Sequence, residues 1–354
     1  MRYKYKVYDN SSMGNLRFNP DAEVFAQIMV ASPGSNSETV YASGYVQDVQ
    51  LDVVIQGQLT GVVEGQDLSS LSGLIHALHI YRDGVLQESH ELSSALAVPF
   101  FNLGQHVPAL YEGDDVFEGT SFVPVTDAVE GFEGNDTFTG YGDVQSDWFY
   151  GGDGIDTSVY RGALDQYTLE IGVPVWDDRS PAGAPVVPGS APNPFVTGKI
   201  VTDNVNDRDG QDQLHSVERL VFSDVCLAFD LDGNAGQTAK ILGAVFGKDS
   251  VSNKVYAGIG LSLLDGGMSH AELMDLALDT ALGSGRTDAN VVNLLYTHLV
   301  GEAPSAEERD AFVDLITSGA YNQISLAQYA ADLDLNATNI QLAGLAETGL
   351  AYVP

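Results

Sequence analysis

The amino-acid sequence predicts a multidomain α+β protein with a β-rich N-terminal domain, a short parallel β-roll and an all-α C-terminal domain. Period-two alternation of apolar and polar residues prevails first, repeats rich in Gly and Asp follow, and apolar residues at helical spacing fill the last third. The chain of 354 residues is long enough for two or three domains. We expect them at residues 1–108, 109–235 and 236–354.

The first domain is predicted to consist of strands. Val, Ile, Thr and Tyr alternate with polar residues, and glycines 44, 57 and 65 are expected to interrupt the strands at 39–41, 45–55 and 59–63. Asp83-Gly84 separates two further strand-like segments, 77–81 and 85–88, and is typical of a two-residue hairpin turn. Residues 1–8 alternate polar and aromatic side chains and are expected to form a strand. They lack the apolar core of a secretory signal.

The composition limits the class of protein. The chain has 15 Lys and Arg against 49 Asp and Glu, a formal charge of −34, while 44% of its residues are hydrophobic. That apolar content suffices for a folded core, and the charge disfavours nucleic acid and anionic membranes as partners. No apolar run is long enough for membrane insertion. The single cysteine, Cys226, excludes an intrachain disulfide and is expected to be a small buried apolar residue.

Residues 110–158 contain a short-period repeat. Three segments follow the pattern Gly-Gly-x-Gly-x-Asp-x-U-x, where U is apolar: Gly113-x-Asp115-x-Phe117, Gly131-x-x-Gly134-Asn135-Asp136-x-Phe138 and Gly151-Gly152-Asp153-Gly154-Ile155-Asp156. Alignment on the Asp-x-U core adds Asp127-Ala128-Val129 and Asp147-Trp148-Phe149. The five aspartates are then 12, 9, 11 and 9 residues apart, close to the nonapeptide period of calcium-binding parallel β-helix repeats. The fifth repeat has Ser158 at U, which predicts that the array ends there.

This spacing predicts calcium binding. Glycines allow tight turns whose carbonyl oxygens point inward, and each aspartate adds a charged oxygen. Calcium takes about 6–8 oxygens, more than one turn supplies, so a site needs two stacked turns. Alternate repeats of a two-sided roll share an edge. We therefore expect two sites on one edge, between Asp115 and Asp136 and between Asp136 and Asp156, and a weaker opposite edge. The expected metal-binding residues are Gly113, Asp115, Gly131, Gly134, Asn135, Asp136, Gly151, Asp153, Gly154 and Asp156, with Asp127 and Asp147 on the weaker edge.

The charges around the repeats favour this interpretation. No Lys or Arg occurs between Arg82 and Arg161, while twelve carboxylates lie between residues 112 and 156. Carboxylates at this density repel one another unless something neutralises them. The alternative is that these are ordinary Gly/Asp turns between strands. Several turns in near-register, with no basic residue nearby, favour calcium.

The remaining segments complete the predicted organisation. Residues 173–199 hold six of the 13 prolines and are expected to form an exposed insertion, followed by strands at 199–205 and 216–221. Helical stripes then appear, at Val291, Leu294, Leu295 and Leu299 and at Leu326, Tyr329, Ala330 and Leu333. Three helix starts are expected at capping-box pairs: Ser269 with Glu272, Ser305 with Glu308, and Ser325 with Gln328.

Residues 110–160 resemble RTX, or hemolysin-type, calcium-binding repeats. Residues 210–224 are similar to the segment that often closes such arrays, and the helical region with Leu295-Tyr296-x-x-Leu299-x-Gly301-x-x-Pro304 resembles a domain that frequently follows RTX repeats in bacterial surface proteins. Two of the five repeats lack the glycines, and the Pro-rich segment interrupts the usual passage. The resemblance implies calcium-coupled folding and type I secretion without a cleaved signal peptide, hence a secreted, extracellular or cell-surface protein.

Other motifs give weaker indications. His76-x-x-His79 lies in a strand-like segment and differs from the helical zinc motif of metalloproteases. Asp230-x-Asp232-Gly233-Asn234 lacks the twelve-residue EF-hand layout and is expected to be a helix-capping turn. Neither a nucleophile elbow nor a P-loop is present in the sequence.

Two functions remain open from the sequence. The first is a non-enzymatic calcium-binding protein that assembles with itself as an S-layer, filament, matrix or adhesin subunit, with cell-surface polysaccharide as a further partner. The second is a secreted hydrolase or lyase that acts on polysaccharide, with its active site in residues 1–108. The acidic composition and the absence of a catalytic motif in the sequence favour the first.

Overall fold

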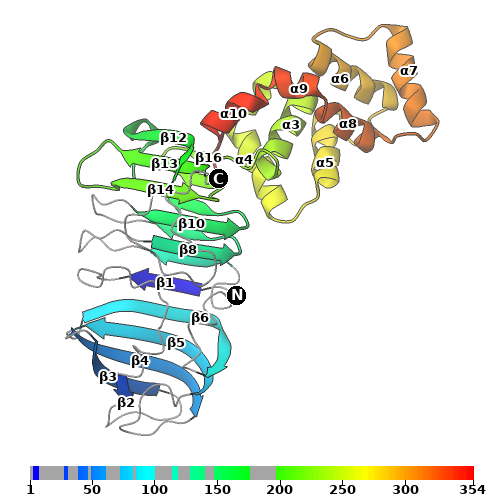
Figure 1. The fold of residues 1–354 in the computed structure, drawn as a ribbon. Coiled ribbons are helices and arrows are strands. Elements are labelled where there is room, and N and C mark those ends of the chain that lie inside the picture. The colour runs from blue at the N-terminus through cyan, green and yellow to red at the C-terminus, as the bar shows by residue number, and fades with distance from the viewer. Residues whose placement is uncertain are drawn as a thin grey trace. The chain divides into compact units, whose positions relative to one another are not determined.

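The computed structural model describes residues 3–7, 28–30, 39–46, 49–60, 72–82, 85–99, 114–118, 128–139, 147–175 and 197–354. The chain divides into two compact units, Met1–Ser223 and Asp224–Pro354. Among the described residues, strands dominate the first unit and α-helices occur between residues 234 and 348, so the mixed α+β class is confirmed (Figure 1). The division of the first unit at residues 108 and 109 stays a prediction.

An antiparallel meander forms the N-terminal part of the first unit. Its strands are β1 (Tyr3–Val7), β2 (Ile28–Val30), β3 (Thr39–Val46), β4 (Val49–Thr60), β5 (Ser72–Arg82) and β6 (Val85–Pro99). Strands β2 to β6 pair in sequence order, and β1 pairs with β6. Arg82 lies opposite Val85, which confirms the hairpin predicted from Asp83-Gly84.

The expected strand breaks in this meander are partly wrong. Gly44 lies inside β3, and Gly57 lies inside β4, where the pairing with β5 shifts register. A glycine at a bulge bends a strand without ending it. Residues 45–55 are not one strand, because Val46, the last residue of β3, lies opposite Val49, the first residue of β4.

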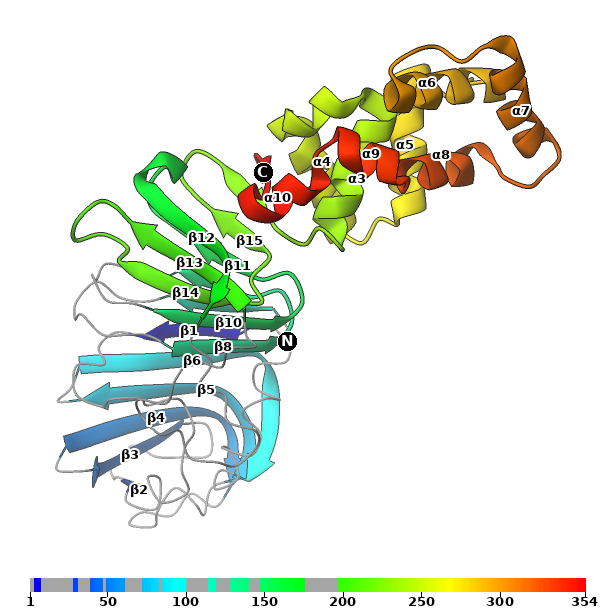
Figure 2. The ribbon, with the colours of Figure 1, turned by 45° about the horizontal axis from the view of Figure 1, so that its top comes forward.

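Two parallel stacks of short strands follow. One contains β7 (Asp115–Glu118), β9 (Thr137–Thr139), β11 (Thr157–Val159) and β15 (Arg219–Val221); the other contains β8 (Ala128–Glu133), β10 (Trp148–Asp153) and β14 (Gln211–His215). Figure 1 shows β8, β10 and β14 side by side, and Figure 2 shows β11 and β15 in the other stack. Strands β7 to β11 therefore alternate between the stacks along the chain. Strand β1 pairs parallel with β7, so one sheet contains both the meander and the first stack.

Those apolar U residues whose side chains are described lie in the interior of these stacks. Phe138 and Phe149 are buried, with stacked rings whose centroids are 5.1 Å apart. Leu214 and Leu220 are fully buried in the last strand of each stack. Ser158, at the U position of the fifth repeat, is buried too. It does not end the array, because β11 pairs onward with β15.

A hairpin is inserted between β11 and the last strands. Strand β12 (Tyr167–Pro174) follows the 3-10 turn Leu164–Gln166 and pairs antiparallel with β13 (Thr197–Asp203), with Pro174 opposite Thr197. Strand β13 then pairs with β14. The predicted strands at 199–205 and 216–221 correspond to β13 and β15, shifted at their ends. Most of the Pro-rich segment, residues 176–196, lies outside the described residues.

Charged side chains hold the base of this hairpin. Arg208 donates two hydrogen bonds of 2.6 Å to the buried carboxylate of Asp203 and lies 4.9 Å from the centroid of the Tyr167 ring. Arg161 bonds the buried Asp209 at 2.6 Å. Burial raises the pKa of Asp203, but hydrogen bonds from Arg208 and two backbone amides outweigh that effect and lower the pKa. The Arg161–Asp209 pair joins the end of β11 to the segment after β13, and the Arg208–Asp203 pair joins that segment to the end of β13.

We predict that Arg208→Met lowers the free energy of unfolding by about 3 kcal/mol, because it leaves the Asp203 carboxylate buried without its guanidinium partner. Urea unfolding measures the change. Lys240→Met, which removes an ion pair with the exposed Asp332, is the control and should cost less than about 1 kcal/mol. Equal losses in the two variants would contradict the assigned role of Arg208.

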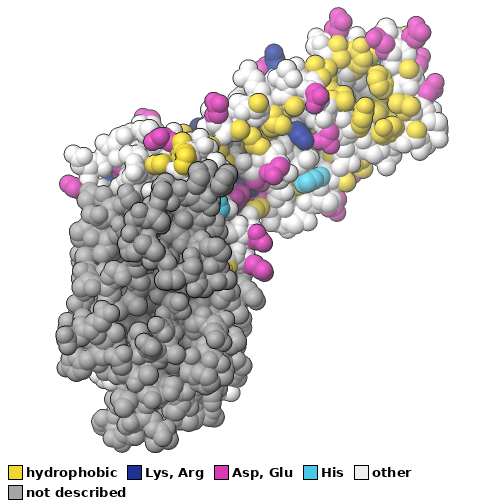
Figure 3. Space-filling view, viewed as in Figure 1, with side chains coloured by type: hydrophobic (Ala, Val, Ile, Leu, Met, Phe, Trp, Pro, Cys, Tyr) yellow, Lys and Arg dark blue, Asp and Glu magenta, His cyan; other side chains and the backbone are white. Residues whose placement is uncertain are grey.

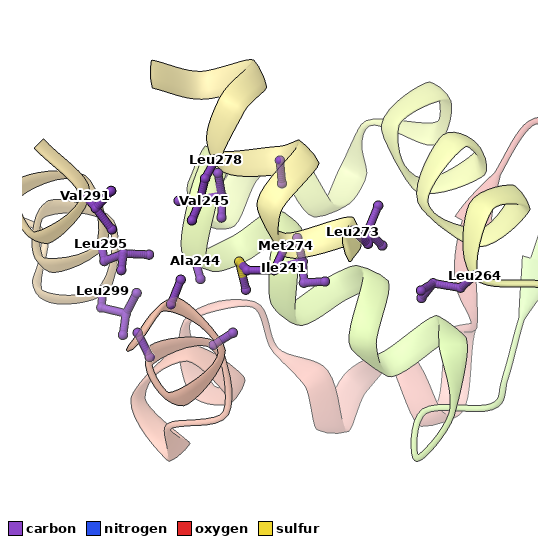
Figure 4. Packing of buried hydrophobic residues seen from close by; sticks show 14 residues of the cluster. Ile241, Ala244, Val245, Leu264, Leu273, Met274, Leu278, Val291, Leu295 and Leu299 are labelled. Carbon is purple, nitrogen blue, oxygen red and sulfur yellow. The ribbon is translucent and has the colours of Figure 1, made fainter. Parts of the chain in front are cut away.

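The second unit contains eight α-helices: α3 (Asn234–Phe246), α4 (Lys254–Asp265), α5 (His270–Leu282), α6 (Asp288–Val300), α7 (Ala306–Thr317), α8 (Gln323–Ala331), α9 (Asp334–Asn339) and α10 (Leu342–Thr348). Figure 4 shows the larger core, in which Met274 and Leu278 of α5 face Val245 of α3 and Leu295 of α6. The predicted α6 stripe is confirmed, since its residues are buried in this core or pack against it. The α8 stripe is half wrong, because Tyr329 is 53% exposed and Leu333 lies beyond the helix.

Two of the predicted helix starts are confirmed. Ser269 and Ser305 form capping boxes with Glu272 and Glu308. The third is wrong: α8 begins after Asn322, whose side chain accepts a 2.8 Å hydrogen bond from the Ser325 amide. Asn is as good an N-cap as Ser, and it comes earlier in the chain.

The second unit spans Asp224–Pro354, and the domain boundary expected between residues 235 and 236 stays a prediction. Strand β16 (Cys226–Ala228) pairs antiparallel with β17 (Leu350–Tyr352), so the two ends of the unit meet. The expected all-α character is therefore incomplete. The N-cap of α3 is Gly233, and Asp230 in the turn before it accepts a 3.1 Å hydrogen bond from the Ala235 amide in the first helical turn, which agrees with the predicted capping turn. Cys226 is free and buried, also as predicted. No helix in the described ranges is long and apolar enough to cross a membrane.

Candidate metal centre

The strand register aligns acidic residues along one edge of the first stack. Val116, Thr137, Thr157 and Arg219 lie opposite one another in β7, β9, β11 and β15. The residue before each is acidic: Asp115, Asp136, Asp156 and Glu218. The first, third and fifth repeats thus share an edge, as their spacing in the sequence predicts. Glu218 extends this series, and we call these four residues the acidic column.

The opposite edge has a second series. Trp148 lies opposite Ala128 and Gln213, so Asp147 and Asp212 occupy equivalent positions. Both carboxylates are buried. Their backbones are also joined, because the Gln213 amide donates a 2.8 Å hydrogen bond to the Asp147 carbonyl oxygen. The third expected member, Asp127, lies outside the described residues.

Stacked glycine turns place carboxylate and carbonyl oxygens together. A Cβ at Gly131 would lie 2.0 Å from Asp136 Oδ2 and 2.4 Å from the Gly151 carbonyl oxygen. One turn further, a Cβ at Gly151 would lie 2.3 Å from Asp156 Oδ2 and 2.0 Å from the Ser216 carbonyl oxygen. Only glycine fits at these two positions. Each of these turns therefore brings its own carboxylate close to a carbonyl oxygen of the next turn.

Hydrogen bonds between turns form two series. In the first, a backbone amide of the earlier turn donates to a side chain of the later turn; in the second, an amide of the later turn donates to a side chain of the earlier turn. In one, the Asp136 amide donates to Asp156 Oδ1 at 2.8 Å, and the Asp156 amide donates to Glu218 Oε2 at 2.9 Å. In the other, the Asn135 amide donates to Asp114 Oδ1 at 3.0 Å, and the Ile155 amide donates to Asn135 Oδ1 at 2.8 Å. Each turn is thus linked to the next by side chains as well as by the sheet.

Burial makes the acidic column electrostatically costly. Asp136 and Asp156 are 1% and 0% exposed. Burial raises the pKa of the Asp156 carboxyl to about 8, the hydrogen bond from the Asp136 amide opposes this rise, and the negative charges of Asp136 and Glu218 add to it. Asp156 Oδ2 is also buried and receives no hydrogen bond from the described residues. A buried carboxylate in this state needs a proton or a cation.

The donor set suits a hard cation. Carboxylate and carbonyl oxygens from two adjacent turns are the ligands that calcium takes, and thiolates and imidazoles are absent from these turns. Within the part of the chain that the structure describes, no three His, Cys, Asp or Glu side chains form a ready-made cluster. Each carboxylate of the Asp136–Asp156–Glu218 series instead belongs to its own turn, and carbonyl oxygens from the next turn supplement it.

The other expected ligands have different positions. Gly134 and Gly154 lie in successive turns, and the Gly134 amide donates a 2.9 Å hydrogen bond to the Asp153 carbonyl oxygen. Asn135 and Asp153 are exposed, so they are not part of the buried column. Asp115 is placed by its backbone alone, and Gly113 lies outside the described residues.

Three acidic residues of these turns and strands, Asp114, Asp212 and Glu218, are not among the ligands expected from the sequence. Asp212-x-Leu214 and Glu218-x-Leu220 have the acid-x-apolar spacing of the repeat core, and both leucines are fully buried. That spacing was the available signal. It is inconspicuous because neither segment has the Gly-Gly-x-Gly pattern and both follow the inserted hairpin.

Comparison of the chain with known sequence families, with curated proteins and with solved structures gave no match in any of the three.

We predict that calcium-free protein loses stability as the pH rises from about 4 to about 8. The pKa of the Asp156 carboxyl is 3.8 in the unfolded chain and about 8 in the folded chain, so the folded state binds this proton more tightly. The stability that the bound proton contributes is therefore lost as the pH rises from about 4 to about 8. Asp156→Asn should flatten the decline while Asp165→Asn, at an exposed position, should not. Urea unfolding with a chelator at pH 5 and pH 8 measures it, and equal declines in all three proteins would refute the assignment.

We also predict that Gly151→Ala costs about 1–3 kcal/mol, because its Cβ would displace Asp156 Oδ2 or the Ser216 carbonyl oxygen. Gly285→Ala is the control, since its Cβ would meet no atom within 4 Å. Thermal or urea unfolding compares the two. A Gly151→Ala protein as stable as the control would show that the turns are not packed as described.

Proposed function

We propose that this chain is a secreted calcium-binding structural protein whose repeat segment folds around calcium and which assembles with itself on or near a bacterial surface. The observation that carries the proposal is the acidic column, in which Asp136 and Asp156 are buried beside each other. Calcium supplies the positive charge that two buried carboxylates require when both are ionised.

The strand arrangement supports the RTX resemblance. Short parallel strands alternate between two sheets, the glycine turns stack, and the repeat aspartates fall in register. These are the features expected of a parallel β-roll with calcium between its turns. On this interpretation the ions bind along the Asp115–Asp136–Asp156 edge.

The chemistry of the turns couples calcium to folding. The oxygens that approach each other at Gly131 belong to Asp136 and Gly151, and those at Gly151 belong to Asp156 and Ser216. Residues so far apart in the sequence come together only in the folded chain. Calcium that binds them therefore stabilises the folded state, and without calcium the buried carboxylates oppose it.

The weak affinity expected of the calcium sites and the negative net charge of the chain both favour a location of the protein where calcium is abundant. Sites in extracellular calcium modules have Kd values of about 10⁻⁴–10⁻³ M and fill only where calcium is plentiful. A formal charge of −34 would expand the calcium-free chain and keep it dispersed. Assembly with other copies is then expected after calcium has bound and the repeat segment has folded.

We predict that calcium raises the stability of the full chain. For a Kd of about 10⁻⁴ M, 10 mM calcium adds about 2.7 kcal/mol, seen as a higher melting temperature. Asp136→Asn should reduce this gain, whereas Asp165→Asn, at an exposed position outside the column, should keep it. An unchanged melting temperature of the wild-type protein across a calcium titration would refute calcium binding.

Electron microscopy of the same samples tests the structural role. Ordered sheets or fibres that form with calcium and dissolve with a chelator are the expected result. Dispersed particles under both conditions would contradict self-assembly, even if calcium raised the melting temperature.

A further inference from the structure

Glu218 takes the position of a repeat aspartate although it lies 62 residues beyond Asp156 in the sequence. Strand β15 pairs with β11 as β11 pairs with β9, with Arg219 opposite Thr157 and Leu220 opposite Ser158. Glu218 therefore stands to Asp156 as Asp156 stands to Asp136. Its acid-x-apolar spacing with Leu220 is that of the repeat core.

The turn that leads to Glu218 stacks on the fifth repeat. Gly131 and Gly151 are equivalent positions in β8 and β10, and Ser216 follows β14 at the corresponding place. The Ser216 carbonyl oxygen approaches Gly151 as the Gly151 carbonyl oxygen approaches Gly131. Ser216 has a φ of 49°, in the left-handed region that favours glycine, so the turn is tight.

This closing turn is shorter than the others. Asp136 and Asp156 each come five residues after their equivalent glycine, whereas Glu218 comes two residues after Ser216. Glutamate is one methylene longer than aspartate and can reach from a shorter turn. Its Oε2 accepts the Asp156 amide at 2.9 Å, while the Glu218 amide donates to the Asp156 carbonyl oxygen at 3.0 Å.

A buried oxygen lies between these two turns. Asp156 is fully buried, and its Oδ2 lies close to the Ser216 carbonyl oxygen and receives no hydrogen bond from the described residues. Two oxygens that both accept and neither donate repel each other unless a cation or a proton lies between them. This oxygen points to a ligand, independently of the number of acidic residues nearby.

We propose that Glu218, together with Asp156 Oδ2 and the Ser216 carbonyl oxygen, forms a further calcium position that closes the acidic column. The proposal rests on the proposed calcium-binding function and adds a ligand outside the glycine repeats. Calcium at this position joins the last repeat to a segment that follows the β12–β13 hairpin. It therefore binds after the chain beyond the Pro-rich segment has returned to the stack.

Calcium titration of the full chain tests this position. Isothermal titration calorimetry of chelator-stripped protein with calcium chloride gives the number of ions and their affinities. Glu218→Gln keeps the oxygen that accepts the Asp156 amide and removes the charge, so it should bind one calcium fewer than wild type. Glu170→Gln makes the same charge change at an exposed position of β12 and should bind the wild-type number.

A second variant distinguishes the loss of a calcium ligand from a failure of the protein to fold. Glu218→Asp keeps the charge but shortens the side chain, so it should bind the wild-type number with one site weakened about tenfold. Wild-type stoichiometry and affinity in both Glu218 variants would overturn the further calcium position and leave the proposed function intact. A wild-type protein that binds no calcium would refute the proposed function itself.

Discussion

The stability of the first unit depends on how the negative charges of the carboxylates inside its stacked turns are compensated. The parallel register that aligns the apolar U residues also aligns the acid two positions earlier, so packing Phe138 and Leu220 inside places Asp136, Asp156 and Glu218 in one series. Hydrophobic burial and electrostatic repulsion therefore increase together as turns are added. A proton on Asp156 relieves the repulsion below about pH 8, and a divalent cation relieves it at any pH at which the carboxylates are ionised.

The two stacks are completed by strands that are distant in the sequence from the repeats. The repeats provide β7 to β11, but β14 and β15 complete both stacks and follow the β12–β13 hairpin. Closing that long loop costs conformational entropy before its contacts form. The Arg161–Asp209 pair offsets part of this cost, because it holds the chain that leaves β13 next to the end of β11.

Local signals in the sequence predicted local features well. Asp83-Gly84 identified a hairpin, Ser269 and Ser305 identified helix starts, and the Asp-x-U spacing identified which repeats share an edge. The sequence-based predictions were wrong where a second local feature, or a segment distant in the sequence, determines the structure. Asn322 precedes Ser325 and caps α8 first, and Gly57 stays within β4 at a shift in the register of its pairing with β5. The period of the repeats does not group Glu218 and Asp212 with them, because the inserted hairpin lengthens the sequence between β11 and β14. Only the strand pairing shows that both residues are in register with the repeat aspartates.

The acidic residues of the chain are of two kinds, exposed and buried, which the composition does not distinguish. Residues 224–354 contain 17 Asp and Glu against five Lys and Arg, and their acidic side chains are spread over the visible face of the second unit (Figure 3). Many of these side chains cap helices or pair locally, as Glu272 does with Ser269 and as Asp275 and Asp279 do with Arg286. Such exposed charges are screened by ordinary salt. The buried carboxylates of the first unit are screened far less, so only a bound ion or a proton compensates them. Screening by salt and compensation by a bound ion or a proton therefore concern different carboxylates of the same chain.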